Sequence, residues 1–115
     1  MANSMLPKKD WSLVPRRALT PTEVVGRLAA VPGWQLAGSG AGVAIEKAFT
    51  FANYHETIAF VNAVAFIAHK QDHHPDLSVH YDRCVVRLNT HDVKGISTTD
   101  LECAARFDAL LAASE

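Results

Sequence analysis

The sequence predicts a single α+β domain in which three helices pack on one face of a four-stranded antiparallel sheet. Three segments begin with helix-capping residues, and four segments carry apolar residues at the spacing of β-strands. Their order is helix, strand, strand, helix, strand, strand, helix, which suits an antiparallel sheet better than a parallel one. The 115 residues, 49% of them hydrophobic, suffice for one compact core and are too few for two ordinary domains.

The first predicted helix begins at Thr20-Pro21-Thr22-Glu23 and ends at Pro32-Gly33. A capping hydroxyl, proline at the first helical position and glutamate three residues after the cap are typical of a helix start. Residues 34–36 can form a short strand before a glycine-rich turn. From residue 43 to residue 51 apolar and polar side chains alternate, with Lys47 as an interruption, which predicts a half-buried strand.

The longest predicted helix follows Asn53, which forms a second capping pair with Glu56. Apolar residues then recur at helical spacing. Pro75 disfavours helical geometry in the residue before it, His74, so we expect this helix to stop near His73.

A β-hairpin and a third helix complete the predicted fold. Residues 77–81 and 84–90 have the composition of strands and are separated by a short turn at Asp82-Arg83, so they should pair antiparallel. Ser97, with Asp100 three residues later, marks the start of the last helix.

Residues 1–19 form an N-terminal arm ahead of the domain at residues 20–115. The arm mixes prolines with basic residues and has neither helical nor strand periodicity. Two interpretations stay open: the arm docks on the domain through Trp11, or it is a disordered tail.

Composition argues against several classes of function. A formal charge of -1 leaves no excess of Lys and Arg for a nucleic-acid partner. No apolar run is long enough for a membrane span or a signal peptide, so we expect a soluble, cytoplasmic protein. Cys84 and Cys103 lie far apart in apolar segments, which favours buried reduced thiols. No glycine-rich loop joins a strand to a helix, so no nucleotide cofactor is indicated.

Four of the six histidines gather at the ends of predicted elements. His69 and His73 are four residues apart and would share a helix face. His74 follows at the helix break, and His91 ends the strand that pairs with the one after His74. Imidazole exchanges protons near neutral pH, as the addition or elimination of water requires. The alternative is that these are polar surface residues at a frayed helix end and a strand cap.

A metal site is the main rival to acid/base chemistry. The spacing His69-x-x-x-His73 occurs in zinc enzymes, and His91 could supply a third ligand. No glutamate lies inside the motif to act as a base, which counts against a zinc enzyme of that kind. The residues alone leave both interpretations open.

The histidines belong to a longer pattern. Its segments are His73-His74-Pro75-Asp76-Leu77, Tyr81, Thr90-His91-Asp92, Gly95-Ile96-Ser97 and Asp100, with Pro32-Gly33-Trp34 and Phe49-x-Phe51 further upstream. Together they resemble the signature of the pterin-4a-carbinolamine dehydratases, also called 4a-hydroxytetrahydrobiopterin dehydratases. The resemblance runs from about Leu19 to Leu110. The paired histidines, the Thr-His-Asp segment and their intervals are specific as a set, whereas any one alone would be weak.

The resemblance implies both a fold and an activity. The fold is a four-stranded antiparallel sheet carrying three helices, in agreement with the element order. The activity is dehydration of 4a-hydroxytetrahydropterin to quinonoid dihydropterin, which recycles the cofactor of aromatic amino acid hydroxylases. The resemblance also implies that the reaction needs neither a metal nor a bound cofactor, which disfavours the zinc interpretation.

Site residues follow from the same resemblance. His73, His74 and His91 match the family's three active-site histidines. Residues 73–75 and 90–93 match its pterin-contacting stretches, so the expected substrate-binding residues are Pro75, Thr90, Asp92 and Val93. The family commonly has an acidic residue four positions before the first histidine. This chain has His69 there, which makes His69 a possible modulator of the neighbouring imidazoles.

Two further expectations concern partners. An open sheet leaves edge strands that a second copy can cover, and family members are dimers or tetramers, so we expect a homodimer or homotetramer. Some family members serve as dimerisation cofactors of a transcription factor, and some relatives act as assembly helpers. A non-catalytic binding module is therefore the alternative function.

Overall fold

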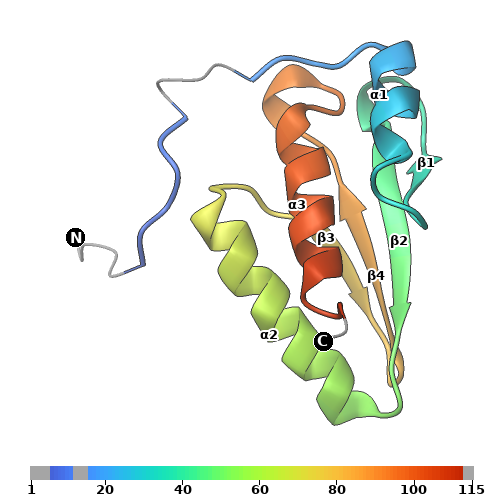
Figure 1. Cartoon of the computed structure of the whole chain (residues 1–115), viewed down its shortest axis with the longest axis vertical. Helices are drawn as coiled ribbons and strands as arrows, with labels where there is room; N and C mark the ends of the chain where they lie inside the picture. Colours follow the sequence, from blue (N-terminus) through green and yellow to red (C-terminus); the bar gives the residue numbers. More distant parts are fainter. Residues whose placement is uncertain (1–5, 12–15, 113–115) are drawn as a thin grey trace.

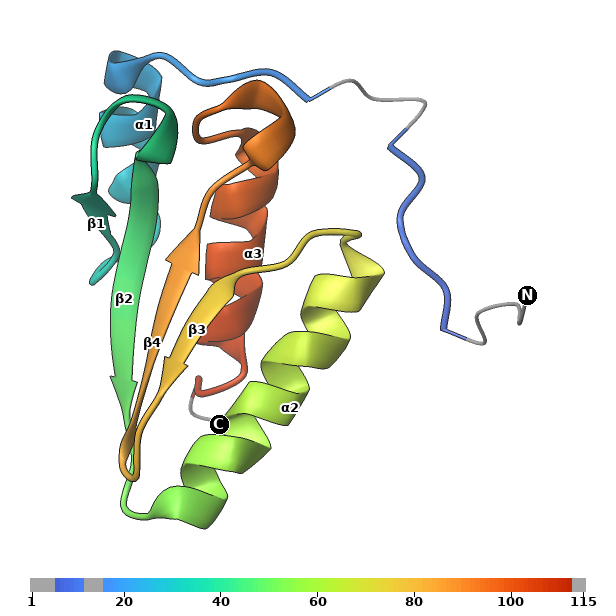
Figure 2. The ribbon, with the colours of Figure 1, turned by 180° about the vertical axis from the view of Figure 1, so that it is seen from behind.

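The computed structural model describes residues 6–11 and 16–112, which form one layer of helices on one layer of sheet (Figures 1 and 2). Within these residues the sheet has four antiparallel strands in the order β1-β2-β4-β3. The strands are β1 (Gln35–Ala37), β2 (Ala44–Thr50), β3 (Asp76–Val79) and β4 (Arg83–Leu88). The α-helices of the described residues, all on one face of the sheet, are α1 (Pro21–Leu28), α2 (Tyr54–Lys70) and α3 (Thr98–Ala109). The predicted fold is confirmed.

The helix starts lie where the capping residues predict them. The Thr20 hydroxyl accepts a hydrogen bond from the backbone N–H of Glu23 at 3.2 Å, and the Glu23 carboxylate accepts one from the Thr20 backbone N–H at 3.0 Å. The Asn53 side chain caps α2 by accepting from the Glu56 N–H at 2.9 Å. These local bonds satisfy backbone donors that a helix start leaves unpaired.

The end of α2 differs from the prediction, because the helix stops at Lys70 and not near His73. Asp72 adopts the left-handed conformation with φ 50°. The N–H of Asp72 then donates to the His69 carbonyl and the N–H of His73 to the Ala68 carbonyl, each at 3.0 Å. This is a Schellman turn, and the short polar side chain of Asp tolerates its left-handed position. His73 therefore lies outside the helix, and the expectation that it shares a helix face with His69 is wrong.

Lys47 continues the alternation of β2 and does not interrupt it. Its ammonium group lies 2.9 Å from a carboxylate oxygen of Asp108 on α3 and 5.0 Å from the centre of the Phe49 ring. The indole N–H of Trp34 donates to the same carboxylate at 3.2 Å. A charged residue can thus occupy an inward position of a strand when a helix supplies its counter-ion.

The apolar core fills the space between the sheet and the helices. Its fully buried members include Ile45, Leu88 and Phe107. Cys84 and Cys103 are buried free thiols, as predicted. Burial raises the pKa of the Cys84 thiol and raises the pKa of the Cys103 thiol to about 12. Among the described residues no helix is both long and apolar enough to cross a membrane.

The described part of the arm contacts the domain. Residues 6–11 and 16–19 contain neither helix nor strand. The indole N–H of Trp11 donates to the Gln71 carbonyl at 2.7 Å, so docking is the interpretation that these residues support. Residues 1–5 and 12–15 of the predicted arm, and residues 113–115 of the predicted domain, lie outside the described residues.

Candidate active site

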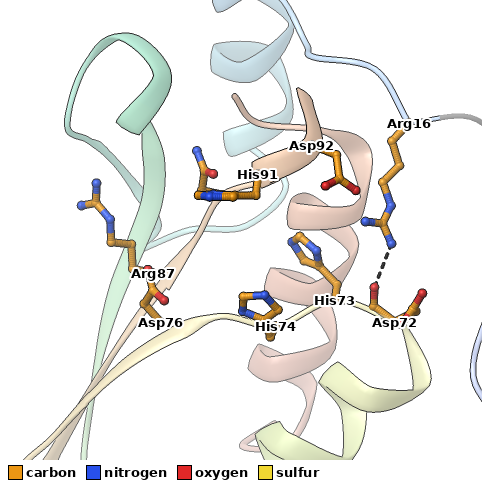
Figure 3. Close-up of a pocket in the computed structure, with 9 residues that line it drawn as sticks. Arg16, Asp72, His73, His74, Asp76, Arg87, His91 and Asp92 are labelled. Atoms are coloured by element: carbon orange, nitrogen blue, oxygen red, sulfur yellow. Dashed lines mark hydrogen bonds between the residues drawn. The ribbon is translucent and has the colours of Figure 1, made fainter. Parts of the chain in front are cut away.

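Side chains from several separate parts of the chain line one cavity of about 440 Å³. These parts are the arm, the turn between α2 and β3, strands β3 and β4, and the short 3-10 helix η2 (His91–Val93) that follows β4. The lining residues, drawn in Figure 3, are Arg16, Asp72, His73, His74, Asp76, Arg87, Asn89, His91 and Asp92. The tertiary fold therefore brings the three predicted catalytic histidines to one cavity.

His73 is held by a buried carboxylate. Its Nε2 lies 2.5 Å from Oδ1 of Asp100 on α3, and the two side chains are 6% and 0% exposed. Because an ionised carboxylate only accepts hydrogen bonds, Nε2 carries the hydrogen and Nδ1 remains as the nitrogen that can accept a proton. Asp100 thus fixes both the orientation and the tautomer of the His73 ring.

The other oxygen of Asp100 is also fully engaged. Oδ2 accepts from the Thr90 hydroxyl at 2.7 Å and from the Ser97 backbone N–H at 2.9 Å. The Thr90 and Ser97 hydroxyls lie 2.6 Å apart, so Ser97 donates to Thr90 while Thr90 donates to the carboxylate. Three donors around one buried carboxylate compensate for its removal from water. Asp100, the N3 residue of the α3 capping box, is therefore also the anchor of His73.

His74 and His91 are the exposed histidines of the cavity. The ring of His74 lies with its centre 6.4 Å from that of His73. His91 begins η2, and two backbone bonds between Thr90 and Gly95 close this segment. Rings open to solvent can exchange protons with water, which a buried ring cannot do directly. The cavity thus combines one fixed imidazole with two accessible ones.

The remaining lining groups give the cavity mixed charge. Arg87 donates to the Gly42 carbonyl at 2.7 Å and lies 3.5 Å from the Glu46 carboxylate. Two guanidinium groups and the carboxylates of Asp72, Asp76 and Asp92 line the same space. A cavity lined by both positively and negatively charged groups suits a polar heterocycle better than a ligand with a strong net charge.

The predicted substrate-binding residues lie in different positions. Asp92 lines the cavity, and Pro75 lines an adjoining hollow that shares His73 and His74 with it. Thr90 is fully buried, with its hydroxyl engaged by Asp100. Val93 is half-buried in η2 and is not among the lining residues.

His69 lies outside the cavity that holds the other histidines and lines the adjoining hollow with His73. Its Nε2 lies 2.9 Å from the Leu6 carbonyl of the arm. The arrangement of His69, His73 and His91 as three metal ligands is not formed. In the described part of the chain no three His, Cys, Asp or Glu side chains are grouped so that they could hold a metal ion.

Sequence reasoning missed several groups at this site. Asp100 was placed in the helix cap and in the family pattern, but its contact with His73 was not expected. Asp76 and Arg87 stand at paired positions of neighbouring strands, a relationship that appears only once the register is known. Arg16 comes from the arm, which carries no periodic signal, so no sequence pattern indicated its place beside the histidines.

Comparison with known proteins supports the resemblance. The family model described as pterin 4 alpha carbinolamine dehydratase matches residues 17–110. A relative from Paracidovorax citrulli, provisionally named a pterin-4-alpha-carbinolamine dehydratase, is 80% identical over 114 residues, covering 99% of this chain and 98% of the relative. A relative from Xanthomonas campestris with the same provisional name is 50% identical over 106 residues, covering 89% and 88% of the two chains.

Two solved structures are similar in fold. A crystal structure from Brucella melitensis, described as a transcriptional coactivator/pterin dehydratase, has a TM-score of 0.78 and 31% identity, covering 84% of this chain and all of that one. A pterin dehydratase-like protein, identified as a RuBisCO assembly factor in the alpha-carboxysome, has a TM-score of 0.60 and 25% identity, covering 71% and 93%. On the family match and the full-length relatives, the chain belongs to the pterin 4 alpha carbinolamine dehydratase family.

Proposed function

We propose that this protein dehydrates 4a-hydroxytetrahydropterin to quinonoid dihydropterin and water by acid/base catalysis from His73, His74 and His91. The observation that carries the proposal is the cavity in which these three imidazoles meet, with His73 anchored on the buried Asp100. Membership of the dehydratase family supports the same reaction.

The chemistry requires one proton donor and one proton acceptor. The C4a–O bond breaks as the leaving hydroxyl takes a proton from an imidazolium and departs as water. A second, neutral imidazole removes the proton from the ring nitrogen, whose electron pair forms the new C=N bond. Because the oxygen leaves as water and the electron pair for the C=N bond comes from the ring nitrogen, the reaction needs no redox partner. Imidazole side chains are suited to both proton transfers.

Exposure suggests how the roles divide. His74 and His91 are exposed and can be reprotonated from solvent after each turnover, so we assign the proton transfers mainly to them. His73, with Nε2 engaged by Asp100, contributes a fixed nitrogen against which the substrate is held. Among the expected substrate-binding residues, Asp92 and Pro75 would contact the pterin. Thr90 would act through Asp100, and Val93 would act by holding η2 in place.

The direct test is a turnover assay with chemically generated 4a-hydroxytetrahydropterin. Formation of quinonoid dihydropterin is followed in the presence of a reductase that consumes it, and the rate is compared with the spontaneous dehydration in buffer. We expect a rate proportional to protein concentration and well above the spontaneous rate. A folded protein that leaves the spontaneous rate unchanged would refute the proposal.

A binding role without catalysis is the second candidate function. The descriptions of the two solved relatives, one a coactivator and one an assembly factor, favour it. The turnover assay separates the candidates, because a binding module would not raise the rate of dehydration above the spontaneous rate. We favour catalysis over binding alone because His74 and His91 both line an open cavity.

The remaining expectations are part of the same proposal. The partner is a small pterin, with an aromatic amino acid hydroxylase in the same recycling pathway. The protein would work in the cytoplasm as a homodimer or homotetramer and without a bound cofactor.

A further inference from the structure

The turn that leads from α2 into the histidine pair is held by the N-terminal arm. A helix end leaves its last carbonyls without partners inside the helix. Here the Lys9 backbone N–H donates to the Lys70 carbonyl at 2.8 Å, and the Trp11 indole N–H donates to the Gln71 carbonyl at 2.7 Å. The guanidinium of Arg16 donates to the carbonyl of Asp72 at 2.8 Å. Three consecutive carbonyls, immediately before His73, thus bind donors from the arm.

Side-chain contacts fasten the same segment. The ammonium group of Lys9 and the guanidinium of Arg16 lie 4.2 and 4.3 Å from the centre of the Trp11 ring. Lys8 pairs with the Asp72 carboxylate at 3.2 Å. The cation–π contacts and this ion pair help to align the arm donors with the turn.

His69 adds a fourth attachment point, one residue before the first of the held carbonyls. Its ring nitrogen lies 2.9 Å from the Leu6 carbonyl, which can only accept, so His69 donates. A carboxylate at this position would offer acceptors alone and would repel the carbonyl. The histidine that departs from the family pattern is therefore chemically suited to holding the arm.

The held turn positions the active site. Asp72 is a non-glycine residue in the left-handed conformation, and the direction of the chain after it sets where His73 and His74 emerge. Arg16 also lines the catalytic cavity itself, and Figure 3 shows its side chain reaching from the arm to Asp72 beside the histidines. The family model begins at residue 17, so the family match assigns no role to the residues that make these bonds.

We propose that the described residues of the N-terminal arm, 6–11 and 16–19, are a working part of the active site. In this proposal Trp11 and Arg16 are positioning residues that hold the Lys70–Asp72 turn and thereby aim His73 and His74 into the cavity. This inference rests on the proposed function for its kinetic consequence. The arm thus adds tertiary hydrogen bonds to the Schellman turn that already ends α2. Small displacements of catalytic groups cost large factors in rate, so loosening the turn should lower kcat more than it raises KM.

The test compares four arm variants. Trp11→Phe keeps the aromatic ring and removes the donor to Gln71, and Arg16→Gln is too short to reach the Asp72 carbonyl. We expect each to lower kcat by roughly 10-fold or more, with KM changed by much less. Arg16→Lys, which retains a charged donor, should recover part of the loss. Arg17→Gln is the matched control, because its guanidinium bonds Glu23 at 2.7 and 2.9 Å and does not line the cavity.

A second readout does not depend on turnover. The ring-proton NMR signals of His73 and His74 should move or broaden in Trp11→Phe and Arg16→Gln and stay in place in Arg17→Gln. If the wild type catalyses dehydration and both variants keep its kcat, the inference is wrong while the proposed function stands. If the wild type is inactive, the proposed function fails and the NMR signals alone decide the inference. A rise in KM at unchanged kcat would also overturn it, since it would mean direct substrate contact without positioning.

His69 provides an isosteric pair for the same test. His69→Gln retains an N–H donor for the Leu6 carbonyl, and His69→Glu offers none at neutral pH. We expect the glutamate variant to show the lowered kcat and the shifted histidine signals of Trp11→Phe, and the glutamine variant to stay close to wild type. Equal behaviour of the two variants would contradict a role for His69 in holding the arm.

Discussion

His73 and Asp100 are joined by a hydrogen bond of 2.5 Å between Nε2 and Oδ1, although they are 27 residues apart in the chain. The carboxylate is fully buried and also binds Thr90 and Ser97. One residue thus caps α3, links it to η2 and sets the tautomer of an active-site imidazole. The cavity geometry and the helix start therefore depend on the same side chain.

Replacing Asp100 with asparagine should separate its two roles. The amide oxygen can still accept from Thr90 and Ser97, so the fold should survive with a loss of about 1 kcal/mol. The amide N–H₂ would donate to Nε2 of His73 and move the ring hydrogen to Nδ1, so that Nδ1 could no longer accept a hydrogen bond from the substrate. We expect kcat to fall by roughly 10²-fold, because the substrate would no longer be held in place by the His73 ring.

The control for this substitution is Asp108→Asn on the same helix. Asp108 pairs with Lys47 and Trp34 at the other side of the domain, so its loss should lower stability and leave kcat unchanged. Thermal unfolding and steady-state kinetics measure the two effects. Equal kcat values for Asp100→Asn and wild type would show that the tautomer of His73 does not matter for turnover.

His74→Ala and His91→Ala should each lower kcat by roughly 10²- to 10⁴-fold while the protein stays folded, because each removes an exposed proton carrier. His80→Ala is the matched control: His80 is also exposed, contacts Ser78 and lies outside the cavity. Circular dichroism verifies the fold and the turnover assay measures the rates. If both cavity variants kept the wild-type rate, His74 and His91 would be ordinary surface residues without a catalytic role.

Exhaustive chelation should leave turnover unchanged, because the proposed mechanism uses imidazoles as proton carriers and not as ligands. The measurement is kcat before and after dialysis against a strong chelator, together with the metal content of the protein. Stoichiometric zinc whose removal abolishes turnover, and whose return restores it, would contradict the acid/base mechanism.

The stability of the protein should fall as the pH rises from about 9 towards 12. Burial raises the pKa of the Cys103 thiol from 9.0 to about 12, so in this range the unfolded chain has lost a proton that the folded protein still binds. The stability of the folded protein therefore decreases as the pH rises. The stabilisation that the Cys103 thiol contributes is fully present only below the pKa of this thiol in the unfolded chain. Denaturant unfolding of wild type and Cys103→Ala should show a shallower pH slope in the variant. Identical slopes would mean that the thiol ionises alike in both states.

The protein should form a homodimer or homotetramer in solution. Strands β1 and β3 are the outer strands of the described sheet, and Val79 on β3 is 40% exposed. A symmetric copy can pair with such an edge and cover its apolar side chains. Light scattering at micromolar concentration measures the mass directly, and a monomer there would refute the expectation.

The fold could be read from the sequence because its signals are local. The caps at Thr20 and Asn53 act over three residues, and strand alternation acts over two, so neighbours along the chain carry the information. The histidine pattern was equally visible. The end of α2 was not, because the left-handed Asp72 has no signature in the apolar pattern, and Pro75 restricts only the residue before it.

The sequence by itself therefore determined the order of the elements, the helix starts and the set of histidines, since each depends on residues close together in the chain. Only the tertiary structure decided that Asp100 anchors His73 and that Trp11 and Arg16 hold the turn before it. The physical reason is that a hydrogen bond between distant segments depends on where the packed core brings their backbones. Neither the apolar periodicity nor local propensity predicts these long-range hydrogen bonds, because they depend on how the whole domain packs.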